Sequence, residues 1–441
     1  MGFNFAFLLV LFVSLLHYPT LLTALHVDKR GVLCCRQLAN QYSSLVSLAN
    51  TNIFTDQQQG SSNGYWTQQE RGLTPSCRFT PATAADVAGA VKLMTDQQCQ
   101  FAVRGGGHMS FAGAANIEDG VTIDLGGMKQ VTVSLDNTTT SVGGGARWVD
   151  VYQKLDSMQL AVSGGRVSDV GVGGLTLGGG NSFFGARYGF GCDGVRNFEV
   201  VLASGTIVNA NATSNTDLFK ALKGGSNNFG VVTRFDFITF PQGDIWGGFV
   251  IYPPTNLDQQ TQALQGFTQA SGDGMDPYAA VINSYIFTQA GLSFVANYYT
   301  HTKPEASPAI FKNFSAIQPQ LQNTMRMATL TNLTFELGTG TPSGYRQLFG
   351  TATFKNDATL FAKILSLANS TFAPLQSVKD FQGSVTLQPI TRAQTSKGGG
   401  AGGNSLGLDP SRGDLICKSS LCLYSKDFHL YLIVSIIFPY L

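Results

Sequence analysis

Apolar residues recur along this chain at two spacings, which predict its helices and its strands. A Thr-X-X-Asp start at Thr83, followed by apolar residues on one face, predicts a helix that leads into a strand at 101–103. Helical spacing predicts further helices at 35–48, 148–155, 217–222, 257–270 and 358–368. Short β-like runs predict strands at 121–125, 131–133, 249–252, 279–287 and 292–299. A hairpin is predicted at 198–209, with Ser204-Gly205 as its turn.

The strand at 101–103 runs through Arg104 into three consecutive glycines and then His108. Consecutive glycines allow positive φ and bring bare backbone N–H groups against a ligand. Such a turn forms a nest of donors that suits pyrophosphate oxygens, and Arg104 can add a charged donor. An ordinary tight turn would explain the same glycines equally well, so this loop alone does not identify a site.

A second glycine cluster occupies residues 164–191, where eleven of 28 residues are glycine. This content is too high for the interior of a helix or strand. Its valine, leucine and phenylalanine residues are too apolar for a plain surface loop. We therefore expect backbone wrapped round a large flat ligand. A dinucleotide-binding Rossmann loop is disfavoured, because no periodic helix follows the glycines.

The bulk composition narrows the class of protein. A length of 441 residues predicts two or three domains with sizeable cores. Lysine and arginine number 28 against 27 acidic residues, and this balance argues against a nucleic-acid-binding protein. Charged residues are 12% of the chain and glycines number 51, as in a β-rich secreted protein.

The first 24 residues predict a secretory signal peptide. Residues 3–16 are almost wholly apolar, Pro19 interrupts the run, and Ala24 offers a small residue at a cleavage point. The run is too short for a membrane span. No lysine or arginine precedes it, and Lys29-Arg30 could be a second processing site. We expect a secreted protein without a membrane span.

Glycosylation sequons and cysteines agree with export. Five asparagines begin Asn-X-Ser/Thr: Asn137, Asn211, Asn313, Asn332 and Asn369. Four of the seven cysteines lie in the first quarter of the chain: Cys34, Cys35, Cys77 and Cys99. We predict one or two disulfides that pin the N-terminal segment to the first βαβ-like unit, with open connectivity. No cysteine or histidine spacing indicates a metal site.

Three motifs around the first loop carry a family resemblance. Arg-Gly-Gly-Gly-His at 104–108, Ser-Phe-Ala-Gly at 110–113 and Ile-Asp-Leu-Gly-Gly-Met at 123–128 resemble the first flavin loop of berberine bridge enzyme-like oxidases, of the fungal type. These belong to the vanillyl-alcohol oxidase family with a PCMH-type FAD-binding domain. Segments 144–152, 164–191 and 224–233 are also similar to family motifs. The resemblance implies that the 8α-methyl group of FAD is covalently bonded to His108.

The resemblance also implies the remaining cofactor site. Some members form a second flavin bond through a cysteine, but Val167 stands there and Cys192 is out of register, so no cysteinyl link is expected. Val170 matches a position linked to reaction with dioxygen, which favours an oxidase over a dehydrogenase. The implied cofactor-binding residues are His108, Arg104, Gly105, Gly106, Gly107, Met109, Ser110, Gly113, Val170, Gly171, Gly173, Gly174, Gly178, Gly179, Asn181, Gly230 and Val232.

The predicted fold is α+β and has two main domains. Residues 31–243 form a PCMH-type FAD-binding domain of two subdomains, with its motif core at 74–243. Residues 244–405 form a substrate domain of antiparallel sheet and flanking helices. Residues 406–441 form an atypical tail that departs from the family pattern and reads as truncated, so the segment expected to finish the flavin site is missing.

The predicted function is that of a secreted FAD-linked oxidase acting as a monomer. A base from the substrate domain, which the sequence does not identify, would take a proton from an alcohol, sugar or amine as hydride passes to the flavin. Dioxygen would reoxidise the flavin and give hydrogen peroxide. Tyr285, Tyr298 and Tyr299 fit a core or surface position better than a catalytic one. The alternatives are an oxidative cyclase or dehydrogenase of the same family, or a non-catalytic flavin- or glycan-binding protein.

Overall fold

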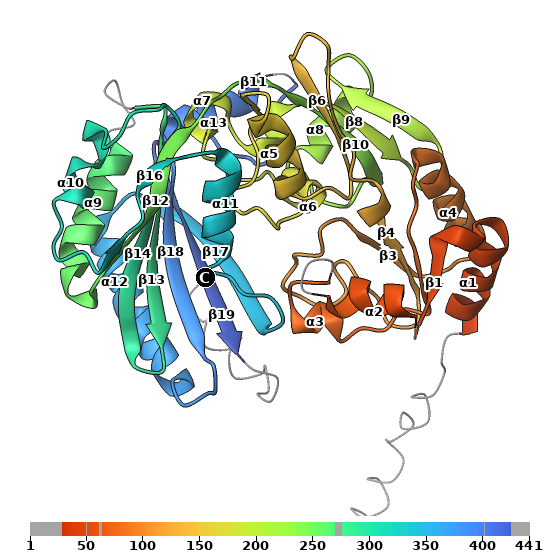
Figure 1. The fold of residues 1–441 in the computed structure, drawn as a ribbon, viewed down its shortest axis with the longest axis horizontal. Helices are drawn as coiled ribbons and strands as arrows, with labels where there is room; N and C mark the ends of the chain where they lie inside the picture. Colours follow the sequence, from red (N-terminus) through yellow and green to blue (C-terminus); the bar gives the residue numbers. More distant parts are fainter. Residues whose placement is uncertain (1–28, 50, 61–63, 270–275, 401, 425–441) are drawn as a thin grey trace, which may run out of the picture.

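The computed structural model describes residues 29–49, 51–60, 64–269, 276–400 and 402–424. The predicted signal peptide and residues 425–441 of the predicted tail lie outside this part of the chain. Two groups of N-terminal strands lie on one side of the molecule, and one large C-terminal sheet lies on the other (Figure 1). The predicted α+β class, with antiparallel sheet and flanking helices, is confirmed.

The first sheet has the strand order β1-β2-β4-β3. Its strands are β1 (Val46–Leu48), β2 (Cys77–Phe79), β4 (Val121–Asp124) and β3 (Phe101–Arg104), of which β2, β4 and β3 run parallel. Helix α4 (Ala84–Asp96) connects β2 to β3. The side chain of Thr83 accepts from Asp86 N, and the Asp86 carboxylate accepts from Thr83 N, so the predicted capping box is confirmed.

Two disulfides hold helix α1 (Lys29–Gln41): Cys35–Cys77 joins it to strand β2, and Cys34–Cys99 joins it to the loop between α4 and β3. The predicted cross-linking of the N-terminal segment is therefore confirmed. The predicted helix at 35–48 is wrong in its second half, because residues 46–48 pair with β2 instead. A further helix, α2 (Asn52–Gln59), begins in the polar stretch after it, where Thr51 accepts a hydrogen bond from Phe54 N.

The second sheet is antiparallel, with the order β5-β6-β10-β8-β9. Its strands are β5 (Val131–Val133), β6 (Thr139–Gly143), β10 (Val231–Ile238), β8 (Val195–Val201) and β9 (Ile207–Asn211), and the predicted hairpin is confirmed as β8–β9. Helices α5 (Trp148–Asp156) and α8 (Thr216–Leu222) contribute Trp148 and Phe219 to its core. A small pair, β7 (Leu160–Ala161) and β11 (Phe240–Pro241), lies beside it.

The large sheet is antiparallel, with the order β15-β12-β14-β13-β18-β19-β17 and β16 paired with β12. Its strands are β12 (Ile245–Tyr252), β13 (Ala279–Thr288), β14 (Gly291–His301), β15 (Gln322–Asn323), β16 (Arg326–Ala328), β17 (Arg346–Lys355), β18 (Gln382–Ile390) and β19 (Leu415–Tyr424). Helices α9 (Leu257–Gln269), α10 (Lys312–Ser315) and α12 (Ala358–Phe372) cover its outer face, and α11 (Leu330–Gly338) lies on the face toward the N-terminal strands (Figure 1).

Strand β19 lies within residues 406–441, which were expected to form an atypical tail. It pairs along its whole length with β17 on one side and β18 on the other. Ile416, Cys422 and Tyr424 are fully buried in the core of this sheet, together with residues of α12. Residues 415–424 are therefore an inner strand of the large sheet. The boundaries proposed for the domains remain predictions.

Short elements complete the fold. The glycine cluster contains α6 (Val172–Leu177) and α7 (Gly185–Tyr188), so the expectation that it excludes helix was wrong for these single turns. The remaining short helices are α3 (Gln68–Arg71), α13 (Arg392–Thr395), η1 (Ser43–Leu45), η2 (Leu125–Gly127), η3 (Gly191–Gly194), η4 (Pro254–Asn256), η5 (Ala309–Phe311), η6 (Ala373–Leu375), η7 (Ser396–Gly399) and η8 (Pro410–Arg412). No helix within the described ranges is long and apolar enough to cross a membrane.

Candidate functional site

The two glycine segments meet in direct backbone contact. A β-carbon added to Gly106 would lie 2.4 Å from the Cα atom of Gly171, and one added to Gly171 would lie 2.4 Å from the nitrogen of Gly106. Contacts this short leave no space for a side chain at either position. The loop after β3 and the start of α6 are therefore in close backbone contact.

A third glycine turn joins them at Gly144. Its N–H donates to Thr233 O at 2.9 Å, and its carbonyl oxygen lies within 3.4 Å of where a β-carbon of Gly105 or Gly173 would stand. Its own β-carbon would lie 2.4 Å from the carbonyl oxygen of Val232. The structure thus brings Gly105, Gly173 and Val232 to one junction. Gly144 was missed as a site residue, although it lies in a run of three glycines.

The junction meets the requirements of a large flat ligand with phosphate groups. β-Carbons added to Gly113 and Gly174 would have no neighbour within 4 Å, so these residues present bare backbone to open space. The hydroxyl group of Thr176, in α6, is buried and has no hydrogen-bond partner among the described residues. Because buried polar groups are normally paired, this hydroxyl is a candidate partner for a ligand. The site therefore fits FAD.

His108 lies between an aromatic ring and a carboxylate. Its imidazole stacks on the indole of Trp66, with ring centroids 4.2 Å apart and an interplanar angle of 14°. Its Nε2 atom is buried and lies 3.7 Å from Oδ2 of Asp169. Burial opposes ionisation of Asp169, but the neighbouring His108 and Arg147 outweigh it and hold the pKa of this carboxyl below its usual value. The imidazole is therefore fixed in plane and faces a carboxylate.

The segment that carries Trp66 is bonded to the start of β17. Gly344 N donates to Trp66 O at 2.8 Å, and the Trp66 indole N–H donates to Thr341 O at 3.2 Å. Gln68 N donates to Tyr345 O at 2.9 Å. On its other side, Trp66 N donates to Gly107 O at 2.9 Å. The ring that supports His108 is thus positioned by the large sheet as well as by the first glycine loop.

Arg104 lies in a buried polar cluster beneath the loop. Its guanidinium donates to Asp124 Oδ2 at 2.7 Å and to Gln57 O at 3.1 Å. Tyr65 places its ring 4.5 Å from this guanidinium, and Arg78 approaches the same carboxylate at 3.7 Å. These contacts show Arg104 supporting the loop from within. Its proposed contact with a phosphate stays a prediction.

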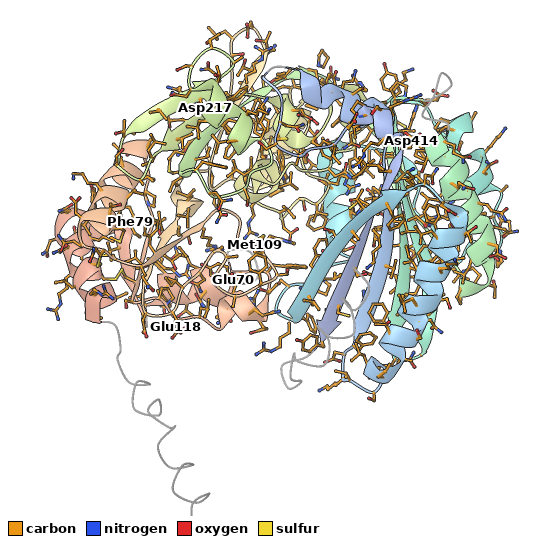
Figure 2. The ribbon with its side chains drawn as sticks, turned by 180° about the vertical axis from the view of Figure 1, so that it is seen from behind. Glu70, Phe79, Met109, Glu118, Asp217 and Asp414 are labelled. Carbon is orange, nitrogen blue, oxygen red and sulfur yellow. A yellow bond between two sulfur atoms is a disulfide. The ribbon has the colours of Figure 1, made fainter. Side chains whose placement is uncertain are left out.

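Glu70 holds the chain that follows His108. Its Oε1 atom accepts from Ala114 N at 2.9 Å and from Ala115 N at 3.2 Å, and the residue is fully buried. Burial raises the pKa of this carboxyl to about 7, although the two backbone bonds oppose the rise. Figure 2 labels Glu70 and Met109, whose carbonyl oxygen accepts from Thr67 at 3.2 Å. Residues 67–70 therefore bond to the chain that follows His108, at Met109 and again at 114–115.

The other predicted cofactor residues lie after His108, in the second glycine segment and just before β10. The side chain of Met109 is exposed and that of Ser110 is partly buried. Gly178 ends α6, and Gly179 has a positive φ of 102° and packs against Leu406. The remaining two are Asn181, which accepts from Gln394 at 3.1 Å, and Gly230, which packs against Val201. These four do not touch the glycine junction in the described contacts.

Three further groups lie away from the junction. Val167, at the position of the second flavin link, lies near Gly338 of α11. Cys192 is fully buried in a separate cluster with Phe190 and Ile390. Tyr285, Tyr298 and Tyr299 are core residues, and the hydroxyl of Tyr298 donates to Leu333 O at 2.6 Å. The interpretation of these tyrosines as core is therefore confirmed.

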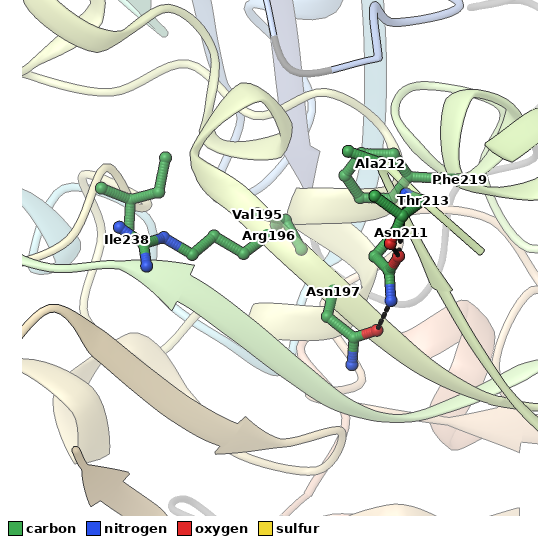
Figure 3. Close-up of a pocket in the computed structure, with 8 residues that line it drawn as sticks. All are labelled: Val195, Arg196, Asn197, Asn211, Ala212, Thr213, Phe219 and Ile238. Atoms are coloured by element: carbon green, nitrogen blue, oxygen red, sulfur yellow. Dashed lines mark hydrogen bonds between the residues drawn. The ribbon is translucent and has the colours of Figure 1, made fainter. Parts of the chain in front are cut away.

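A surface pocket of about 350 Å³ lies on the second sheet (Figure 3). None of the predicted cofactor residues lines it. Asn211, the second predicted sequon, lies at its edge and donates to Asn197 Oδ1 at 3.1 Å. Its lining residues are Val195, Arg196, Asn197, Asn211, Ala212, Thr213, Phe219 and Ile238. This pocket is therefore separate from the glycine junction.

Comparison with known proteins agrees with this geometry. A family model described as an FAD binding domain matches residues 75–211. An FAD-dependent monooxygenase of Cochliobolus heterostrophus is 37% identical over 360 residues, which cover 78% of this chain and 68% of that protein. An FAD-dependent monooxygenase of Emericella nidulans is 36% identical over 385 residues, which cover 86% of this chain and 78% of that protein.

Solved structures share the fold at lower identity. Berberine bridge enzyme in complex with (S)-reticuline has a TM-score of 0.69 at 13% identity, covering 90% of this chain and 80% of that one. A berberine bridge enzyme-like protein of Physcomitrella patens has a TM-score of 0.70 at 18% identity, covering 89% and 84%. The chain is therefore an FAD-dependent oxidoreductase and belongs to the family that contains these fungal monooxygenases and the berberine bridge enzyme-like oxidases.

Proposed function

We propose that this chain is a secreted oxidase that carries FAD covalently attached to His108. The observation that supports this most directly is the placement of His108 at the glycine junction. The imidazole emerges from the first glycine loop, is fixed by Trp66, and faces Asp169 in the second glycine segment. A histidine with only a structural role would be expected to have both ring nitrogens paired, but Nε2 has no hydrogen-bond partner among the described residues.

FAD supplies a two-electron acceptor, and the protein supplies binding and orientation. The backbone at 105–107 and 171–180 offers N–H groups to the phosphates, and the open space at Gly174 leaves room for them. Trp66 links the attachment site to the start of β17, so the flavin would be positioned against the large sheet. A base on that sheet would take a proton from an alcohol, sugar or amine, and the bound flavin would supply the hydride acceptor, with dioxygen as the final acceptor that becomes hydrogen peroxide.

Secretion is proposed from three features. The first 24 residues have the pattern of a signal peptide. Two disulfides fix the N-terminal helix, as is usual for proteins of an oxidising compartment. Four of the five sequon asparagines are exposed: Asn137, Asn313, Asn332 and Asn369. Expression in a eukaryotic host, followed by analysis of the medium and glycosidase treatment, tests this part.

The covalent link is tested by precipitating the protein with acid and recording flavin absorbance in the pellet. We expect the pellet of the parent protein to stay yellow and that of His108→Ala to be colourless. Peroxide release against a panel of alcohols, sugars and amines then tests the oxidase reaction. A colourless parent pellet would contradict the covalent link at His108. Oxidation of a substrate without release of peroxide would contradict the oxidase reaction.

A second function is favoured by the names of the similar fungal proteins. They are called FAD-dependent monooxygenases, and berberine bridge enzyme is similar in fold. An oxygenation or a ring-closing oxidation in secondary metabolism is therefore the alternative. Turnover under labelled dioxygen separates these reactions. A monooxygenase places one labelled oxygen atom in the product, whereas an oxidase releases both as hydrogen peroxide.

A further inference from the structure

Arg166, in the second glycine segment, reaches across to the large sheet. Its guanidinium donates a hydrogen bond to Oε1 of Gln388 on β18. The amide nitrogen of Gln388 in turn donates to the hydroxyl of Ser419 on β19 at 3.3 Å. Among the described residues the guanidinium makes no other hydrogen bond. Arg166 is therefore a direct polar contact between the second glycine segment and the large sheet.

The positive charge of Arg166 has no carboxylate partner in the part of the chain that the structure describes. Burial lowers the pKa of its guanidinium to about 10, and among the same residues only the nearby thiol of Cys417 acts in the opposite direction. Charges inside proteins are normally paired, because an unpaired one loses its hydration without compensation. The side chain nevertheless keeps partial accessibility. The guanidinium is therefore available to an anion that enters from outside.

Hydroxyl groups line the sheet beside Gln388. Ser284, Thr386 and Ser419 are direct neighbours on β13, β18 and β19, and they form one line across three strands, the hydroxyl row. Because side chains alternate along a strand, this row lies on the same face of the sheet as Gln388. The hydroxyls of Ser284 and Thr386 are bonded to each other at 2.9 Å. The row offers neutral donors and acceptors, so an anion held beside it would depend on the charge of Arg166.

The turn that carries Arg166 is held by the second sheet's core. The hydroxyl of Tyr152, a core residue, donates to Gly165 O at 2.5 Å, on the residue just before the arginine. Asp169, which faces His108, follows three residues later. One short segment therefore reaches the proposed flavin attachment site with one side chain and the large sheet with another.

We propose that Arg166 determines substrate specificity by binding an acidic oxygen of the substrate, a carboxylate or a phenolate, beside the hydroxyl row. This inference rests on the proposed function, since it places the substrate between the bound flavin and the large sheet. A guanidinium binds both kinds of oxygen through charge-assisted hydrogen bonds. A neutral sugar or alcohol would leave the charge of Arg166 without a counterion. The expected substrates are therefore alcohols or amines that also carry a carboxylate or an acidic phenol.

Calorimetric titration of the full-length protein with its flavin tests this contact without turnover. Benzoate and 4-nitrophenolate are the anionic probes, and benzyl alcohol is a neutral probe of similar size. We expect the parent to bind at least one anionic probe about 30-fold more tightly than benzyl alcohol, because hydrogen bonds to charged groups are the stronger ones. The probe that binds tightly tells which acidic oxygen the site accepts. Arg166→Met should abolish this preference, and Arg166→Lys should keep part of it. Arg196→Met, at an exposed arginine of β8, is the matched control and should bind as the parent does.

Gln388→Glu tests the same contact with the arginine in place. The new carboxylate would pair with the guanidinium and compete with an entering anion. We expect this variant to bind the preferred anionic probe about 10-fold more weakly and benzyl alcohol as the parent does. Its midpoint of thermal unfolding should stay at or above that of the parent, because a buried charge gains a partner. A loss of anion binding without a loss of stability distinguishes a binding role of Arg166 from a purely structural one.

The outcomes separate this inference from the proposed function. Equal affinity of the parent for anionic and neutral probes, or an unchanged preference in Arg166→Met, would overturn the role of Arg166 and leave the flavin link at His108 standing. A parent that releases its flavin in acid but still selects an anionic probe through Arg166 would contradict the covalent link alone. A parent that binds no flavin at all would contradict both.

Discussion

Gly106 and Gly171 are in backbone contact, and neither position has room for a β-carbon. A methyl group on Gly106 would lie 2.4 Å from Gly171 Cα, well inside van der Waals distance. Gly106 is also held by a side chain, since the guanidinium of Arg147 donates to Gly106 O at 3.0 Å. The contact between Gly106 and Gly171 brings the first glycine loop and the second glycine segment together.

Alanine at either glycine should separate the two segments. We expect Gly106→Ala and Gly171→Ala each to cost about 1–3 kcal/mol of stability, as overpacking of a filled site does. Bound flavin should fall further than stability, because the damage is at the junction itself. The ratio of flavin to protein absorbance and the midpoint of thermal unfolding measure the two effects.

Gly243→Ala is the matched control for this pair. It lies at an exposed position between β11 and β12, and an added β-carbon meets nothing within 4 Å. Replacing glycine by alanine where the backbone can accept it changes stability by less than about 1 kcal/mol, so stability and flavin content should stay near the parental values. If Gly106→Ala kept full flavin content while Gly243→Ala lost it, the junction would not be the site.

Asp124 should be essential for the stability of the first sheet. It is the carboxylate that both Arg104, at 2.7 Å, and Arg78, at 3.7 Å, approach within the protein interior. Removing one partner of a buried ion pair leaves an uncompensated charge, so Asp124→Asn should cost about 3–5 kcal/mol. Chemical denaturation measures this loss. Asp244→Asn, on an exposed loop, should cost little, and equal effects of the two variants would argue against a buried charge cluster.

Local signals explain which elements of the fold could be predicted. The capping box at Thr83 and the Ser204-Gly205 turn are complete within a few residues, and both were correct. The helix predicted at 35–48 failed because residues 46–48 pair with β2, which lies 29 to 33 positions further along the chain. Strand β19 was missed for the same reason, since its position depends on β17 and β18. Pairing between distant segments overrides local preference.

The candidate site also has a part that local sequence predicts and a part that it does not. The glycines and His108 form a motif of consecutive residues and were predicted from it. Trp66 and Asp169 touch His108 from segments on either side in the sequence, and neither belongs to a pattern that names its role. Glu70 was also missed, because its partners at 114–115 are backbone N–H groups that any residue could supply. The roles of Trp66, Asp169 and Glu70 depend on contacts that exist only in the folded chain.

The disulfide Cys35–Cys77 should contribute to stability through the chain it closes. It joins α1 to β2 across a sequence separation of 42 residues. Loss of a loop constraint of this size should cost about 2–5 kcal/mol, so the paired variant Cys35→Ser with Cys77→Ser should unfold at a lower temperature. Cys192→Ser, at a buried free thiol, is the comparison. A larger loss from Cys192→Ser would contradict a stabilising role for the disulfide.

The Glu70 carboxyl should make the stability of the protein depend on pH. Burial raises its pKa from 4.5 to about 7 in the folded protein. The folded state therefore binds this proton more tightly than the unfolded state does. The resulting stabilisation is complete below the unfolded pKa and is lost as the pH rises through the folded pKa.

Glu70→Gln tests this dependence, because a glutamine oxygen can accept the same bonds from Ala114 and Ala115 without titrating. Relative to the parent, the variant should gain roughly 1–2 kcal/mol of unfolding free energy between about pH 5 and about pH 8. Glu305→Gln, on an exposed turn, should show no such gain. A constant difference across this range would mean that Glu70 is ionised throughout, and the backbone bonds at 114–115 would then outweigh its burial.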